Sequence, residues 1–258
     1  MIRGMSFEPA TWGEFDPATF ERIVVVSPHF DDAAMGAGHL LASYDDTTVI
    51  TVLAGQPPAY PEVPSEWDAL GGFGPGDDVV AARQLEDKAA MEVLESDYRW
   101  LDFPDHQYLA PKDRPTPEQV APTLAAAIRD IDPSAVFFPM GLGNPDHVMV
   151  HDASLRARSE GGDRAWFCYE DHGYKHIPGL LAWRVAKLLR SQPWPTPSIV
   201  PHEIDEERKR RAIWCYTSQI APLENEHALS ARLDAHVPEQ FWNLAPPPHG
   251  WEGLADLI

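Results

Sequence analysis

The fold is decided by the segment Ile23-Val-Val-Val-Ser-Pro-His-Phe-Asp-Asp32. Its first four residues are β-branched and apolar, which is typical of a strand that is buried on both faces of a sheet. Ser27 and Pro28 end this strand, and a helix is expected from about Ala33 to Ser43. A second β-branched run follows at 47–53. The first fifty residues therefore indicate a βαβ unit with two parallel strands.

The rest of the chain continues this alternation. Helices are expected at 78–95, 117–131, 180–189 and 205–216, and strands at 98–101, 135–138 and 166–169. A long loop rich in Gly and Pro lies between the second strand and the next helix. The 258 residues suit one domain. We predict a single α/β domain over 1–258, Rossmann-like, with a mostly parallel sheet and helices on both faces. Its core spans about 20–220, and an irregular segment follows residue 221.

The composition limits the class of partner. Lys and Arg number 20 against 40 Asp and Glu, a formal net charge of −20. Such a surface repels nucleic acids and anionic lipids, although it can also serve solubility alone. Cys168 and Cys215 lie among apolar and aromatic residues, where free thiols are usual. The first twenty residues lack a signal peptide, and no segment is long and apolar enough to span a membrane. We expect a cytoplasmic protein.

Polar residues follow directly after the first strand. His29, Asp31 and Asp32 lie close together in the sequence. Two adjacent carboxylates repel each other unless a cation or a hydrogen-bond donor lies between them. A His and an Asp three residues apart on a turn can bind the same metal ion. The alternative is that Asp31 or Asp32 caps the next helix, a position where Asp is preferred.

A second polar cluster follows the predicted strand 135–138. There a Gly-rich turn leads into Asn144-Pro-Asp-His147, and the Asn-Pro step favours the start of a helix. His147 is then expected on the first helical turn, at the same edge of the sheet as His29. His29, Asp32 and His147 would make a three-ligand site for zinc or another divalent ion. An open fourth position is typical of catalytic zinc sites.

Two neighbours of His147 have less specific interpretations. His151 lies four residues further on, but the intervening Val-Met-Val lacks the Glu of the zinc-protease helix. We therefore expect His151 behind the site or on the surface. Asp146 is expected to orient His147 or to cap its helix, because a carboxylate often lies behind a ligating His.

The two motifs in this order resemble the PIG-L/LmbE family of zinc-dependent de-N-acetylases. Pro-His-x-Asp-Asp follows a first strand, and Pro-Asp-His follows a later Gly-rich turn. Weaker matches continue along the chain: Arg83-x-x-Glu86, Asp105, Tyr169-Glu-Asp171 with Tyr174, and Lys209-x-x-Ala212 with Tyr216-x-Ser-Gln219. The resemblance covers about residues 20–220. The first motif is fairly specific, whereas the later matches count only as an ordered series.

The resemblance implies a role for each matching residue. Three would be the zinc ligands: His29, Asp32 and His147. Asp31 would be the general base that takes a proton from the water on the metal, and this water would attack an amide carbonyl. Arg83 and Asp105 would contact sugar hydroxyls. The implied reaction removes an acyl group, in the simplest case acetyl, from the nitrogen of an amino sugar or related glycoconjugate.

One position departs from the family pattern. The second motif is usually His-Pro-Asp-His, whose first His helps to stabilise the tetrahedral intermediate, and here that residue is Asn144. An Asn can donate a neutral hydrogen bond to an oxyanion but cannot carry a proton or a positive charge. We assign Asn144 to the catalytic residues. His172, in the loop after the strand at 166–169, is a candidate substitute and is assigned to substrate binding.

Three functions are consistent with these residues. The leading hypothesis is hydrolysis of an N-acyl amino sugar, with a small-molecule sugar or glycoconjugate as the partner. A metal-dependent phosphoesterase is the second, because His and Asp clusters also build two-metal sites. A degenerate family member that only binds sugar, with zinc in its structure, is the third. Asn144 keeps this third hypothesis open and Asp31 argues against it. The sequence leaves open whether the chain forms a homo-oligomer.

Overall fold

The computed structural model describes residues 15, 17–159, 164–191 and 194–245. Within them, seven strands form one sheet in the order β3-β2-β1-β4-β5-β7-β6. The strands are β1 (Ile23–Ser27), β2 (Thr47–Thr51), β3 (Asp97–Trp100), β4 (Ala135–Pro139), β5 (Ala165–Tyr169), β6 (Trp194–Ser198) and β7 (Phe241–Ala245). β1 to β5 are parallel, and β7 is antiparallel to both of its neighbours. The predicted α/β fold with a mostly parallel sheet is confirmed.

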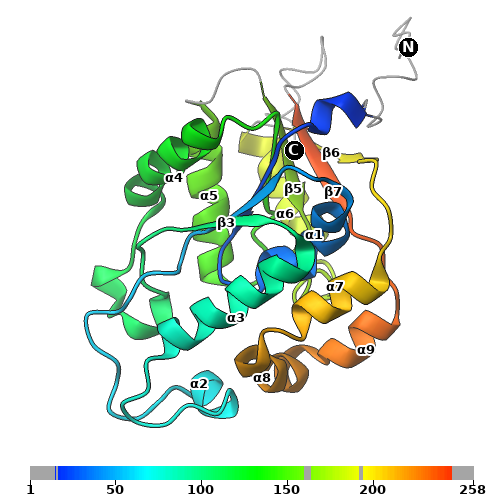
Figure 1. The fold of residues 1–258 in the computed structure, drawn as a ribbon. Coiled ribbons are helices and arrows are strands. Elements are labelled where there is room, and N and C mark those ends of the chain that lie inside the picture. Colours follow the sequence, from blue (N-terminus) through cyan, green and yellow to red (C-terminus); the bar gives the residue numbers. More distant parts are fainter. Residues whose placement is uncertain (1–14, 16, 160–163, 192–193, 246–258) are drawn as a thin grey trace, which may run out of the picture.

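Helices cover both faces of the sheet (Figure 1). They are α1 (Asp32–Ser43), α2 (Glu66–Leu70), α3 (Val79–Leu94), α4 (Pro117–Ile131), α5 (Pro145–Ser159), α6 (Leu180–Ser191), α7 (Glu206–Ile213), α8 (Thr217–His227) and α9 (Leu229–Asp234). Two short 3-10 helices, η3 (His106–Tyr108) and η4 (Pro111–Asp113), lie between β3 and α4. In the described part of the chain, no helix combines the length and the apolar character that crossing a bilayer requires.

The strand that the sequence singled out, β1, lies near the middle of the sheet. All five of its residues are buried. Ile23 and Val25 belong to the core that α1 covers, whereas Val24 and Val26 belong to the core on the other face, under α4 and α5. The chain runs from β1 to β2 and β3 on one side and then crosses to β4 on the other. In such sheets the carboxyl ends of the two central strands open a crevice that binds ligands.

The segment after residue 221 is not irregular as expected, which corrects that part of the prediction. It contains the end of α8, then α9 and the strand β7, which lies between β5 and β6. The strand β6 was missed because Pro195 and Pro197 interrupt the pattern of a strand. Within the described residues β6 pairs with β7 alone, and an edge strand of this kind tolerates proline.

Helix α1 contains a kink that a distant carboxylate stabilises. Ala37 has non-helical φ and ψ angles of −142° and 25°. Beyond the kink, the backbone N–H groups of His39 and Leu40 donate hydrogen bonds to the Glu239 carboxylate at 2.8 and 3.1 Å. Lys209 Nζ pairs with the same carboxylate at 2.7 Å, and both of these charged residues are buried. The segment just before β7 therefore satisfies donors in the helix that follows β1.

Candidate active site

The turn between β1 and α1 is held by Ser27. Its hydroxyl accepts a hydrogen bond from Ala33 N at 2.9 Å and donates to His29 O at 2.5 Å. Asp31 occupies the N-cap position of α1, yet among the described residues its side chain makes no capping hydrogen bond. The alternative in which Asp31 caps the helix is therefore not what the structure shows. The Asp31 carboxylate is buried and lines the cavity described below.

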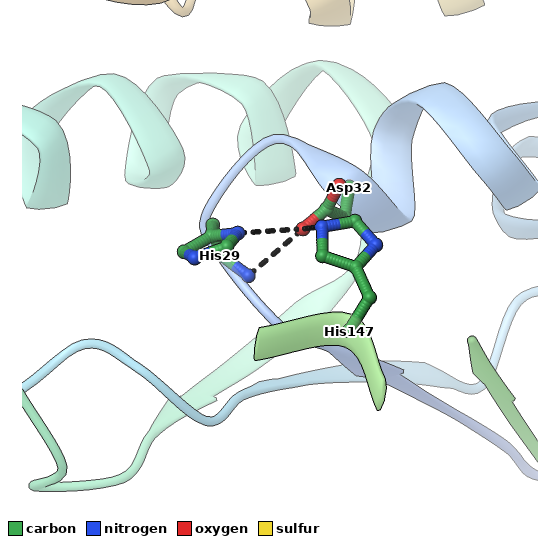
Figure 2. Close-up of side chains that lie close together, drawn as sticks. All are labelled: His29, Asp32 and His147. Carbon is green, nitrogen blue, oxygen red and sulfur yellow. Dashed lines mark hydrogen bonds and ion pairs between the residues drawn. The ribbon is translucent and has the colours of Figure 1, made fainter. Parts of the chain in front are cut away.

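The three residues expected to bind a metal ion lie together at the carboxyl ends of β1 and β4 (Figure 2). Asp32 Oδ2 lies 3.2 Å from His29 Nδ1 and 3.3 Å from His147 Nε2. One ligand atom from each residue lies within 4.8 Å of the others. Two imidazoles and one carboxylate are ordinary zinc ligands, and three protein ligands leave a position for water or substrate. The donor set fits a divalent ion such as zinc.

Each of the two histidines has a carboxylate behind it. His29 Nε2 lies 3.1 Å from Asp146 Oδ2, and His147 Nδ1 lies 2.5 Å from Asp171 Oδ1. Asp171 Oδ2 also accepts a hydrogen bond from Leu142 N at 3.0 Å. Carboxylates in this position fix the tautomer and the orientation of ligating imidazoles. Asp146, which was expected to orient His147 or to cap its helix, thus contacts His29, and Asp171 contacts His147.

The electrostatics of the cluster favour a cation. Burial opposes protonation of His29, but its hydrogen bonds to Asp146 and Asp32 raise its pKa well above the usual value. Burial likewise opposes protonation of His147, and the charges of Asp32 and Asp171 raise its pKa overall. Burial, followed by repulsion from Asp32, raises the pKa of Asp31 to about 7. The carboxylates thus hold positive charge on the imidazoles, and a metal ion would supply that charge directly.

Asn144 contributes to the site through both ends of its amide. Its Oδ1 accepts a hydrogen bond from Asp146 N at 2.8 Å and so caps α5, the helix that carries His147. Its Nδ2 donates to the Tyr174 hydroxyl at 3.4 Å. The preceding Gly143 has a φ of +69°, and a Cβ there would overlap the Tyr174 ring. The glycine therefore allows Tyr174 to lie against the loop beside His147.

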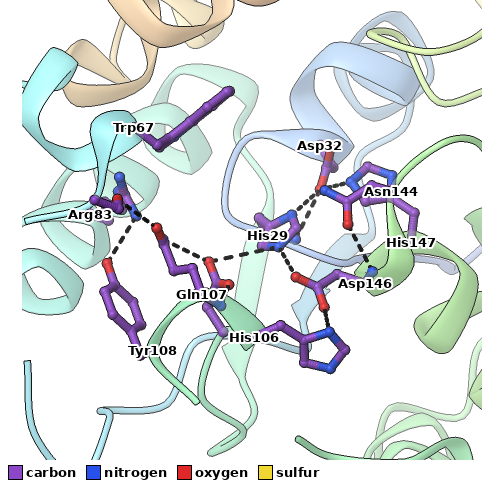
Figure 3. A network of polar contacts seen from close by, with 12 residues as sticks. His29, Asp32, Trp67, Arg83, His106, Gln107, Tyr108, Asn144, Asp146 and His147 are labelled. Atoms are coloured by element: carbon purple, nitrogen blue, oxygen red, sulfur yellow. Dashed lines mark hydrogen bonds and ion pairs between the residues drawn. The ribbon is translucent and has the colours of Figure 1, made fainter. Parts of the chain in front are cut away.

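The two expected sugar-contacting residues, Arg83 and Asp105, both line the cavity. Figure 3 shows Arg83 beside Tyr108 and Trp67, with His29 nearby. The guanidinium of Arg83 is buried and pairs with Asp68, with Nη2 to Oδ1 at 2.8 Å. The Tyr108 hydroxyl donates to the second oxygen of Asp68 at 3.0 Å. Asp105 caps η3 and lies 3.9 Å from His29 Nε2. Together with Asp146 and His29 it forms a second group with metal-ligand geometry, which shares His29 with the first.

The cavity lined by His29, Asp32 and His147 has a volume of about 360 Å³. Aromatic and polar side chains form its walls, among them Trp67, Tyr108, Tyr174 and His227. The described residues that line it do not include His172, so the assignment of this residue to substrate binding stays a prediction. The neighbouring Gly173 lines the cavity instead. Burial lowers the pKa of His172 to about 3, so its ring is neutral near pH 7.

Sequence analysis gave no role to several residues of the site, Asp171 and His227 among them. Asp171 was recognised only as part of a matching series, although it follows β5 directly and so lies at the same edge of the sheet. His227, at the end of α8, came from the segment that was predicted to be irregular. His151 is fully buried, and its Nδ1 lies 2.8 Å from Pro139 O, which agrees with a place behind the site.

With this geometry established, comparison with known proteins identifies the class. The model of the GlcNAc-PI de-N-acetylase family, PIG-L, matches residues 24–158. The match spans more than half of the chain and contains both loops that carry the metal-binding cluster. The chain belongs to the PIG-L family.

Several individual relatives are deacetylases by name. The 1D-myo-inositol 2-acetamido-2-deoxy-α-D-glucopyranoside deacetylase of Kineococcus radiotolerans is 30% identical over 215 residues, 68% of this chain. The match covers only 55% of that relative's own length. A deacetylase triple mutant of the teicoplanin biosynthetic pathway is 27% identical with a TM-score of 0.72, covering 89% of this chain and all of that one. The zinc-inhibited form of teicoplanin deacetylase has the same TM-score and coverage at 25% identity.

Proposed function

We propose that this protein is a zinc-dependent de-N-acetylase that removes an acetyl group from an amino sugar within a glycoconjugate. The proposal depends on one observation: His29, Asp32 and His147 converge in a cavity. The carboxylate of Asp31, next to Asp32 in the sequence, lines the same cavity and does not cap α1. A site that only binds sugar has no use for a second buried carboxylate at this place. The named activities of the relatives support the same reaction.

His29, Asp32 and His147 would hold the zinc ion, which would supply a Lewis acid and lower the pKa of a bound water. Asp31 accepts the proton that the attacking water loses, because its carboxylate is buried in the cavity and is not engaged in capping α1. The proton on Asp31 is then available to the amine that leaves. One side chain thus serves first as base and then as acid, and the net reaction converts the acetamide and water to acetate and an amine.

Asn144 and Tyr174 form the second part of the proposed mechanism. The amide of Asn144 donates to the Tyr174 hydroxyl, so the hydroxyl proton of Tyr174 is available for another acceptor. Tyr174 packs against the His147 ring, with ring centroids 5.4 Å apart, and lines the cavity. It can therefore donate to the carbonyl oxygen as negative charge develops there. Asn144 acts through Tyr174 and keeps the start of α5 in place.

The experiment is an acetate-release assay on the purified protein, with its metal content measured in parallel. N-acetylglucosamine, N,N′-diacetylchitobiose and an N-acetylglucosaminyl inositol are suitable substrates. We expect about one zinc per chain and acetate release that a chelator abolishes and zinc restores. Asp31→Asn should retain the metal and lose turnover, whereas Asp45→Asn, at an exposed position, should behave as wild type. Bound zinc without release from any acetamide would contradict the proposal and favour a binding module.

A further inference from the structure

The guanidinium groups of the cavity differ in how they are neutralised. Arg83 and Arg114 are the two that line it in the described part of the chain. Arg83 pairs with Asp68 at 2.8 Å and lies over the Phe73 ring, 5.6 Å from its centroid. Its charge is therefore matched by Asp68, although its Nε, like that of Arg114, is buried without a hydrogen-bond partner among the described residues. Arg83 is available to contact substrate, but it does not require an anion from outside.

Arg114 has no such partner. It follows η4 directly and is half-buried. Its Nε is buried and lacks a hydrogen-bond partner among the described residues, and no described Asp or Glu forms an ion pair with it. Buried donors of charged groups are rarely left unpaired, because their lost hydration is not replaced. An oxygen atom of a ligand could accept the hydrogen bond that the Arg114 Nε–H group lacks.

The side chains around Arg114 carry mostly negative charge. Carboxylates dominate the charged side chains of the cavity: Asp31, Asp32, Asp105, Asp146 and Glu226. The whole chain carries a net charge of −20. An acidic ligand would be repelled from such a cavity unless a cation met its charged group. A neutral sugar would gain little from an unpaired guanidinium, which is the side chain best suited to bind carboxylate or phosphate through two parallel hydrogen bonds.

The position of Arg114 indicates which part of the ligand it would meet. The metal-binding residues come from the loops after β1 and β4, whereas Arg114 comes from the segment 105–114 between β3 and α4. Asp105, at the start of this segment, lies 3.9 Å from His29 Nε2, whereas Arg114 lies at its other end, nine residues further along the chain. The acidic group therefore belongs to the part of the substrate beyond the acetamide.

We infer that Arg114 forms a subsite for an anionic group, a carboxylate or a phosphate, and that the natural substrate is an acidic derivative of an N-acetyl amino sugar. This inference rests on the proposed de-N-acetylase function. Arg114 is on this account a specificity residue: it binds the acidic group and takes no part in cleavage of the amide.

The test compares three substrates that differ only at the anomeric position of N-acetylglucosamine. These are the neutral methyl glycoside, the carboxymethyl glycoside and the 1-phosphate. The quantity measured is kcat/KM for each acidic substrate divided by kcat/KM for the methyl glycoside. In the wild type we expect one acidic substrate, the carboxylate or the phosphate, to be preferred. Arg114→Gln should lower that ratio about 10- to 100-fold, the value of a charge-assisted hydrogen bond, and Arg114→Lys should lower it less.

Lys112→Gln is the matched control, because it removes the same charge from an exposed residue of the same segment that does not line the cavity. Its ratio should equal that of the wild type. A ratio that Arg114→Gln leaves unchanged, or that both variants lower equally, would overturn the subsite. If no substrate releases acetate, the proposed function fails instead. Calorimetric binding of the same three compounds to wild type and Arg114→Gln then tests the subsite: preference for an acidic compound that Arg114→Gln abolishes supports it, and equal binding refutes it.

Discussion

Replacing Asp171 by Asn tests whether the carboxylate behind His147 determines metal affinity. Asp171 is 2% exposed and uses both oxygens, one toward His147 Nδ1 at 2.5 Å and one toward Leu142 N at 3.0 Å. An amide has only one oxygen. In either orientation of the Asn side chain, one N–H group would face another N–H group, and the negative charge that holds the imidazole would be lost.

The expected magnitude follows from this geometry. Loss of a carboxylate behind a ligating His weakens metal binding about 10- to 100-fold. At about 1.4 kcal/mol for each factor of ten, this corresponds to roughly 1.4–2.8 kcal/mol. A single charge-assisted hydrogen bond contributes a similar amount, about 1.5–3 kcal/mol. The loss of this one interaction is therefore sufficient to explain the predicted effect.

The assay is zinc competition against a chromophoric chelator at constant pH. Asp152→Asn is the control, because Asp152 lies on α5 with its side chain 42% exposed and pairs with Arg184 at 3.5 Å, and not with a ligating histidine. We expect its zinc Kd to match the wild type. Thermal unfolding of each metal-free protein separates a folding defect from a binding defect. A Kd for Asp171→Asn within twofold of wild type, in a folded protein, would refute the role assigned to Asp171.

Three other predictions concern individual side chains. His147→Ala should lose stoichiometric zinc, and an unchanged metal-to-protein ratio by elemental analysis would exclude it as a ligand. His172→Ala should retain wild-type kcat/KM for acetate release; a large loss would place that side chain at the substrate after all. Burial raises the pKa of Asp87 from 3.8 to about 6, so its folded form holds a proton that the unfolded form releases. The free energy of unfolding should therefore fall by roughly 2 kcal/mol between pH 4 and 7, relative to Asp87→Asn, which cannot ionise. Urea unfolding at both pH values measures this difference, and parallel pH profiles for the two proteins would contradict it.

Much of the metal-binding cluster could be predicted from sequence because it depends on strand order alone. His29 and Asp32 follow β1, and His147 follows β4 by one turn and the start of a helix. Once both strands are parallel neighbours, their carboxyl ends meet at one edge of the sheet, whatever the loops do in detail. The contacts of the two histidines with Asp146 and Asp171 could not be predicted from strand order alone. Whether Asp146 faces His147 or His29 depends on side-chain directions within the first turn of α5.

The parts that the sequence could not determine depend on loop conformation and long-range pairing. His172 and Gly173 are adjacent in a turn after β5, and only the glycine lines the cavity. A sequence pattern does not determine which of two neighbours in such a turn points inward. The strands β6 and β7 have no clear alternation of their own, and each is stabilised by pairing with a strand that is distant in the sequence.

The position of β7 has a consequence for the order in which the domain assembles. The parallel strands β1 to β5 can pair as they leave the ribosome, but β6 is made before the strand that joins it to the sheet. Until residues 239–245 emerge, β5 has an open edge, and the donors freed by the kink in α1 lack Glu239. Completion of the helix that carries Asp32 thus depends on a segment about two hundred residues later in synthesis. Chains shortened before Glu239 should accumulate as aggregation-prone intermediates with an exposed strand edge.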